Sequence, residues 1–87
     1  MIDGRIRIYT TRRYDRQFAK LSPIARAAIR RALRYLRQPD RIQPLSSNPD
    51  IFELRAGPWR VTWCYGEDPD QILLRNCGEH DRVLRRP

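Results

Sequence analysis

The stretch FELRAGPWRVTW, residues 52–63, predicts the β-hairpin on which the rest of the fold is built. Apolar and polar residues alternate on both sides of its central Gly-Pro pair, which is the pattern of two strands with one buried face. If the buried face keeps its parity across a loop of four residues, Leu54 pairs with Val61. The same register places Arg55 directly opposite Arg60 on the polar face of the hairpin.

Two directly opposed arginines repel each other, so their pairing is costly unless something lies between them. An anion held between Arg55 and Arg60 would turn the repulsion into a clamp, since guanidinium groups bind phosphate as a planar fork. The alternative is that the arginines pair with acidic neighbours such as Glu53 or Glu79, or only keep the sheet edge soluble. Both interpretations stay open at the level of the sequence.

Two amphipathic helices are expected before the hairpin. The first covers residues 11–21, with Thr10 or Thr11 as its N-cap. The second covers residues 22–39, where Ser22 is a good N-cap, Pro23 suits the first turn and Pro39 ends the helix. Its apolar stripe consists of Ala25, Ala28, Ile29, Ala32, Leu33 and Leu36.

Strands complete the predicted fold. Residues 5–10 form a strand before the helices, and residues 71–77 form another after the hairpin strands, which cover 51–55 and 59–65. Residues 39–50 have the composition of a loop. The order β-α-α-β-β-β predicts the α+β class, with a small antiparallel sheet packed by two N-terminal helices.

The charge of the chain points to its partners. The 87 residues make one domain, 1–87, with a small core, and they carry a net charge of +8. Lys20 is the only lysine, so nearly all of the positive charge is arginine. Such a balance favours a nucleic acid, an acidic protein partner, or both.

Several classes of protein do not fit the sequence. Cys64 and Cys77 lack the CxxC spacing of zinc sites, and we expect no metal and no cofactor. A disulfide between adjacent strands is possible, but reduced thiols that fill space in the strands are the default. The start of the chain lacks an apolar signal segment, and no apolar run is long enough to span a membrane. We therefore expect a soluble cytoplasmic protein.

One histidine, His80, follows the last predicted strand. A neutral imidazole is the side chain best suited to moving protons near pH 7, although a lone histidine is more often just a polar residue at a strand end. Arg75 on that strand is expected to face the same way as Arg55 and Arg60. Trp63 and Tyr65 are expected in the core, and the place of Trp59 stays open.

The chain resembles the RelE/ParE-type toxin superfamily of bacterial toxin–antitoxin modules. The resemblance covers nearly the whole chain, and its most specific part is the hairpin ELR-x-G-x-WRV followed by HD, residues 80–81. The other segments that carry it are YDRQFAKL, IARAAIRRALRYL and ILLRNCGEHDRVL.

The resemblance implies a site and a reaction. RelE-like members cleave mRNA in the ribosomal A site without metal. Arg60 matches the hairpin arginine that stabilises the scissile phosphate, Arg55 matches a second basic residue, and His80 matches a residue that acts on the leaving group. We expect further RNA phosphate contacts from Arg75, Arg82, Lys20 and Arg85.

Two departures from the family pattern keep an alternative open. Ile51 and Glu53 replace basic residues of some members, and residues 82–87 lack an aromatic that several members carry. ParE-like members share the fold but inhibit DNA gyrase instead of cutting RNA. In either case the expected partner is a cognate antitoxin with an acidic segment that is disordered when free and folds onto the toxin.

Overall fold

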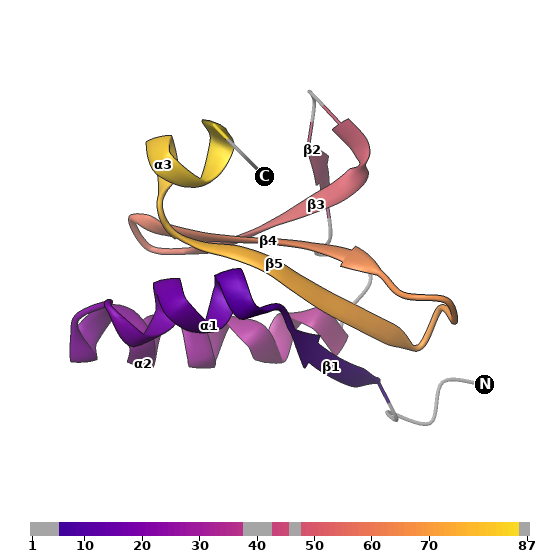
Figure 1. The fold of residues 1–87 in the computed structure, drawn as a ribbon, viewed down its shortest axis with the longest axis horizontal. Coiled ribbons are helices and arrows are strands. Elements are labelled where there is room, and N and C mark those ends of the chain that lie inside the picture. The colour runs from indigo at the N-terminus through magenta and orange to yellow at the C-terminus, as the bar shows by residue number, and fades with distance from the viewer. Residues whose placement is uncertain (1–5, 38–42, 46–47, 86–87) are drawn as a thin grey trace.

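The computed structural model describes residues 6–37, 43–45 and 48–85. The described residues form one five-stranded sheet and three α-helices, and a 3₁₀ helix, η1, continues the second helix (Figure 1). The elements are β1 (Arg7–Thr10), α1 (Arg12–Ala19), α2 (Pro23–Ala32), η1 (Leu33–Arg37), β2 (Gln43–Leu45), β3 (Asn48–Ala56), β4 (Trp59–Tyr65), β5 (Gln71–Glu79) and α3 (His80–Arg85).

The two N-terminal helices begin where the sequence predicts. The Thr11 hydroxyl accepts a hydrogen bond from the backbone N–H of Tyr14 at 3.1 Å and so caps α1. The Ser22 hydroxyl does the same for the N–H of Ala25 at 3.1 Å, with Pro23 at the start of α2. The second helix is shorter than predicted, because its last turns tighten into η1, and Pro39 lies outside the described residues.

The strand order in the sheet is β1-β5-β4-β3-β2. Neighbours from β2 to β5 are antiparallel, but β1 runs parallel to β5, so the sheet is mixed. The helices α1 and α2 come between these parallel strands in the chain and cover one face of the sheet, while α3 lies over the other (Figure 1). A parallel pair needs such a long connection, whereas the predicted antiparallel hairpins do not.

The predicted loop over residues 39–50 is wrong in part. Within it the structure has the edge strand β2 and the first residues of β3. A proline is tolerated in an edge strand because one side of that strand has no neighbour to bond, so Pro44 does not exclude the strand. Residues with the composition of turns therefore form the short edge strand β2 and its partner in β3.

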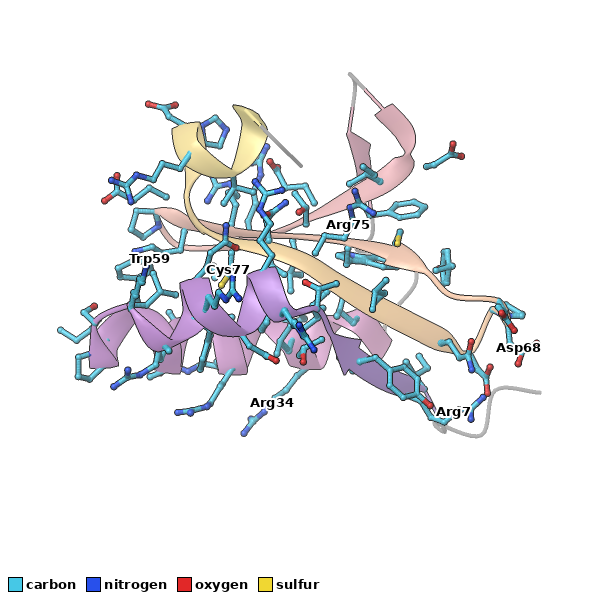
Figure 2. The ribbon with its side chains drawn as sticks, in the orientation of Figure 1. Arg7, Arg34, Trp59, Asp68, Arg75 and Cys77 are labelled. Atoms are coloured by element: carbon cyan, nitrogen blue, oxygen red, sulfur yellow. The ribbon has the colours of Figure 1, made fainter. Side chains whose placement is uncertain are left out.

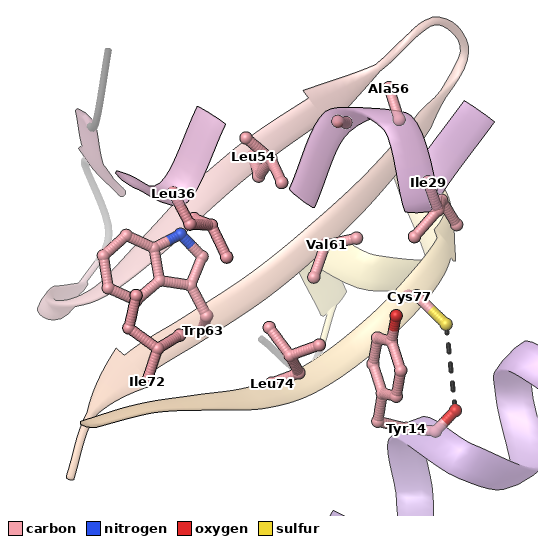
Figure 3. Close-up of a cluster of buried hydrophobic side chains, with 11 residues drawn as sticks. Tyr14, Ile29, Leu36, Leu54, Ala56, Val61, Trp63, Ile72, Leu74 and Cys77 are labelled. Atoms are coloured by element: carbon pink, nitrogen blue, oxygen red, sulfur yellow. Dashed lines mark hydrogen bonds between the residues drawn. The ribbon is translucent and has the colours of Figure 1, made fainter. Parts of the chain in front are cut away.

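The core lies between α1, α2 and the sheet (Figure 3). Ile29 and Val61 are fully buried there, and Trp63 is fully buried with its ring stacked on Phe52 at 4.6 Å between centroids. Burial of one such side chain stabilises a fold by about 1.5–3 kcal/mol. Every residue of the predicted stripe on the second helix is buried or half-buried, which confirms that stripe.

One polar side chain ties α1 to the sheet. Gln17 donates from Nε2 to Oδ1 of the buried Asn76 at 3.1 Å, and its Oε1 accepts the backbone N–H of Cys77 at 2.9 Å. Buried polar groups are costly unless they are paired, so these bonds satisfy groups that packing removes from water. They also set the position of α1 along β5.

Candidate nucleic-acid interface

The hairpin register is confirmed. Arg55 pairs with Arg60 between β3 and β4, and Leu54 pairs with Val61. The loop is tighter than the predicted four residues, because Ala56 and Trp59 still pair and only Gly57 and Pro58 turn. Gly57 has a φ of 63°, and a two-residue hairpin loop requires this positive value at its first position.

Glu53 lies on the same face as the two arginines and meets both of them. Its Oε1 is 3.5 Å from Nε of Arg55 and 3.9 Å from Nε of Arg60. The predicted alternative, in which an acidic neighbour pairs with the arginines, is therefore confirmed for Glu53. The sequence alternation predicts this pairing, because Glu53 and Arg55 are two residues apart in one strand and so point to the same face.

The guanidinium of Arg60 is held in a defined place. One of its terminal nitrogens, Nη1, donates to the carbonyls of Gly57 at 2.5 Å and of Trp59 at 2.8 Å. The side chain is only 15% exposed, and its Nε is buried without a hydrogen bond in the described structure. Arg60 is thus a fixed cation at the end of the hairpin, as an electrostatic catalyst needs.

Arg55 differs from its partner in exposure. Its side chain is 73% exposed, and of the described residues only Glu53 forms an ion pair with it. An exposed pair of this kind is weak, since solvent screens it and the long side chain loses entropy when it is held. The Arg55 side chain is therefore available to a ligand that competes for it.

Figure 2 shows the Arg75 side chain on the side of the sheet away from α1. Arg60 lies on this same face, because it is four residues from Cys64 in β4 and Arg75 reaches Cys64. The register between β4 and β5 shifts next to Arg75, because Thr62 pairs with Asn76 and Trp63 pairs with Leu74. Arg75 is the extra residue that this bulge places between the partners of Thr62 and Trp63, and its Nη1 lies 4.0 Å from Sγ of Cys64. The predicted direction of Arg75 is confirmed, and a β-bulge sets it.

His80 is the first residue of α3, at the end of β5. Arg60 pairs with Gly78, whose φ of 152° is a value that other residues rarely adopt. The chain turns there into α3, and the half-exposed ring of His80 places Nδ1 3.3 Å from Oδ1 of Asp81. If Nδ1–H donates to that carboxylate, Nε2 is left as the proton acceptor. Among the described residues, neither Arg55 nor Arg60 forms a hydrogen bond or ion pair with His80.

Lys20 and Arg82 come from opposite ends of the sequence and line one hollow of about 540 Å³. Lys20 caps the end of α1, and Arg82 is on α3. This hollow is separate from the Arg55–Glu53–Arg60 cluster. The side chain of the last predicted contact, Arg85, lies outside the described side chains.

The predicted burial of the aromatic residues is wrong at one position. Trp63 is in the core, as predicted, but Tyr65 is 44% exposed, although its ring packs edge-on against Trp63 at 5.1 Å. Tyr65 lies at the end of β4, where the core no longer covers the strand. Trp59 is half-buried beside the turn and lines two hollows.

Both cysteines are free. Cys77 faces α1, where its Sγ donates to the carbonyl of Tyr14 at 3.8 Å (Figure 3), and burial raises the pKa of its thiol to about 12. Cys64 lies beside Arg75 on the other face, so the sheet separates the two sulfurs and the disulfide considered from the sequence does not form. Within residues 6–37, 43–45 and 48–85, no group of three or more metal-ligating side chains comes together.

Among the helices in the described part of the chain, none combines the length and apolar character that crossing a membrane requires.

Comparison with known proteins shows the fold. No protein-family model matches the sequence, and no curated protein matches it. Among solved structures, the chain is similar to one from the RelBE2 toxin–antitoxin complex of Mycobacterium tuberculosis, with 19% identity and a TM-score of 0.73. That match covers 86% of this chain and 98% of the other.

Two further structures have the same architecture. The isolated RelE toxin of E. coli is 18% identical, with a TM-score of 0.69 over 93% of this chain and 97% of that one. A YoeB/ParE toxin from Agrobacterium tumefaciens is 13% identical, with a TM-score of 0.67 over 85% and 98%. The chain therefore has the RelE-type fold, as its sequence led us to expect.

Proposed function

We propose that this chain, which has the RelE-type fold, is the toxin of a toxin–antitoxin module and cleaves mRNA on the ribosome. The observation that supports the proposal best is the set of cations on one sheet face, where Arg55, Arg60 and Arg75 lie on three successive strands and His80 begins the helix that lies over this face. The solved structures with this fold include toxins bound to their antitoxins. The net charge of +8 fits a polyanionic substrate.

The reaction that suits these side chains uses the RNA as its own nucleophile. The 2′-OH attacks the neighbouring phosphorus while its proton passes to a water molecule, the bond from phosphorus to the 5′-oxygen breaks, and a 2′,3′-cyclic phosphate forms without a metal. Arg60 and Arg55 would stabilise the charge on the phosphorane, and losing one such fixed donor typically costs ~10²–10³ in rate. Protonated His80 would give its proton to the leaving oxygen, a step worth about 10²–10⁴.

Glu53 sets a condition on this mechanism. Its carboxylate occupies the place between Arg55 and Arg60 that a substrate phosphate would need. Binding of RNA would therefore exchange one anion for another, beginning at the exposed Arg55. Positioning by the ribosome would help that exchange, because a bound reactant competes at a high effective concentration.

The test is to induce the wild type and the His80→Ala variant in cells and to map mRNA 5′ ends. The His80 side chain is half exposed, and among the described residues it forms a hydrogen bond only with Asp81, so its removal should leave the fold intact. Cleavage should fall at least 100-fold in the variant, while the exposed substitution Glu67→Gln should leave it unchanged. Equal cleavage by the wild type and His80→Ala would remove His80 from the mechanism, and growth arrest without cleavage would contradict the nuclease.

One observation favours a second candidate function, a ParE-like inhibitor of DNA gyrase. Nη1 of Arg60 is bonded to the turn carbonyls and its Nε lies 3.9 Å from Glu53, and among the described residues no hydrogen bond or ion pair joins Arg60 to His80. A binding surface needs no such free catalytic groups. Purified protein with gyrase and supercoiled plasmid distinguishes the two functions: trapped cleavage complexes support the inhibitor, and full gyrase activity at an excess of the protein excludes it.

The partner that we propose in both cases is an antitoxin with an acidic segment that folds on binding. Its carboxylates would neutralise the basic surface, while its apolar residues would set a slow dissociation rate. The association rate should fall steeply from low to high salt, and the dissociation rate should change little. An association rate that does not depend on salt would contradict the electrostatic part of this proposal.

A further inference from the structure

Two hollows meet at Trp59, and their charges are opposite. The larger one, about 540 Å³, is bordered by Lys20 and Arg82. The smaller one, about 350 Å³, is bordered by Pro58, His80 and Asp81. Trp59 and Glu79 line both, so the indole stands where a basic hollow passes into an acidic one.

The basic hollow suits a phosphate, because its two cations outnumber the single carboxylate of Glu79. Neither the Lys20 nor the Arg82 side chain forms a hydrogen bond or ion pair within the described part of the chain, and both are exposed. Ser22, the N-cap of α2, lines the same hollow, so the positive end of that helix dipole adds to the field of the two cations. Fixed cations on two sides of a hollow bind an anion more strongly than either does alone.

The acidic hollow suits the edge of a base rather than a phosphate. Carboxylates such as Glu79 and Asp81 only accept hydrogen bonds when they are ionised, and they repel phosphate. The amino and imino groups of nucleobases are donors that such carboxylates bind. The half-buried indole of Trp59 supplies an aromatic surface between the two chemistries, and base stacking on such a surface does not depend strongly on sequence.

We propose that these two hollows form a nucleotide subsite separate from the Arg55–Glu53–Arg60 cluster. The base of one nucleotide stacks on Trp59 with its donor edge toward Glu79, and its phosphate lies between Lys20 and Arg82. Trp59 precedes Arg60 in β4, and the side chains of neighbouring strand residues point to opposite faces, so the subsite lies around the end of the hairpin from the proposed cleavage site and holds another nucleotide of the same strand. This inference rests on the proposed function, since it takes single-stranded RNA as the ligand.

The experiment is titration of the purified protein with a 2′-O-methyl pentanucleotide, which cannot be cut because its 2′-oxygens are blocked. Trp63 is fully buried, so quenching of intrinsic fluorescence reports on Trp59. We expect quenching by the oligonucleotide and little quenching by an abasic strand of the same length. Trp59→Phe should abolish the quenching but keep the binding, when binding is followed by anisotropy of a labelled strand. Trp59→Leu should weaken binding roughly 5- to 150-fold.

The double variant Lys20→Gln/Arg82→Gln tests the phosphate contact. Its matched control, Arg13→Gln/Arg31→Gln, removes the same charge from exposed positions on α1 and α2. Only the first variant should lower the slope of log affinity against log salt, by about 0.7 for one neutralised phosphate. Equal slopes for the two double variants, or equal affinity for the abasic strand, would overturn the subsite. If poly-glutamate displaces the oligonucleotide and quenches Trp59 as strongly, the nucleotide subsite is also overturned, and the ligand is an acidic polypeptide instead.

The outcome separates this inference from the nuclease itself. No ribosome and no cleavage are involved in the titration, whereas the nuclease is tested by His80→Ala in cells. Loss of the subsite with intact cleavage would contradict only the subsite. Binding at Trp59 by a protein that never cleaves mRNA would contradict only the proposed reaction.

Discussion

Replacing Glu53 by glutamine should weaken the fold and strengthen RNA binding at the same time. The Glu53 carboxylate lies 3.9 Å from Nε of Arg60, and these side chains are only 13% and 15% exposed. At an effective dielectric constant of ~20, opposite charges at this distance attract each other by about 4 kcal/mol before desolvation is subtracted. Breaking a buried pair costs about 3–5 kcal/mol, because one charge is left uncompensated.

The loss should be smaller here than in a fully buried pair. Arg60 keeps its two hydrogen bonds to the carbonyls of Gly57 and Trp59, and glutamine keeps the shape of the side chain. Arg55 adds little, because it is 73% exposed and screened by water. We therefore expect a loss of about 2 kcal/mol in the free energy of unfolding, out of roughly 4–13 kcal/mol for a chain of this length.

Urea denaturation followed by the fluorescence of the buried Trp63 measures this change. With an m-value of ~1 kcal/mol/M, the midpoint should fall by roughly 2 M. RNA affinity should rise in the same variant, because a phosphate no longer competes with the carboxylate, and the salt dependence of binding should steepen. Glu67→Gln is the matched control, since it makes the same change in charge at an exposed position in the turn after β4.

Two results would refute the reasoning. If Glu53→Gln and Glu67→Gln unfold at the same urea concentration, the attraction between Glu53 and Arg60 contributes nothing net to stability. If the two variants bind RNA equally well, Glu53 does not compete with phosphate for the arginines. A gain in affinity in Glu53→Gln together with a loss of cleavage would show that the carboxylate also takes part in the reaction.

The remaining predictions concern the core, the thiols and the turn. Ile29→Ala should cost about 2–5 kcal/mol in urea denaturation because Ile29 is fully buried, while Ile24→Ala, at a position that is 74% exposed, should change the midpoint little. Iodoacetamide at pH 8 should label Cys64 in the folded protein and spare Cys77, whose burial raises its pKa to about 12; mass spectrometry that finds both labelled equally would contradict this. Gly57→Ala should destabilise by ~1–2 kcal/mol through the positive φ alone, since the new Cβ would meet the ring of Trp59 at an ordinary 3.9 Å; an unchanged thermal midpoint would argue against the backbone explanation.

The sequence determined those parts of the fold that depend on local chemistry. Ser22 with Pro23 defines the start of α2, because a hydroxyl cap and a proline satisfy the first turn wherever they occur. The alternation of residues 52–63 determines which residues pair across the hairpin, because a slip of one residue would turn every apolar side chain to water. The order of elements and the opposition of Arg55 and Arg60 follow from this stretch and its neighbours.

Only the tertiary structure decided what the functional side chains meet. The parallel pairing of β1 with β5 and the bulge that directs Arg75 depend on contacts between distant segments, which no local pattern encodes. Glu53 was one of several possible partners for the arginines, and the distances in the folded hairpin select it. Lys20 and Arg82 are 62 positions apart, and they share a hollow only because α1 and α3 pack around the end of the same strand. Side chains acquire such neighbours through packing in three dimensions, so the chemistry of this surface appears only once the sheet and helices are assembled.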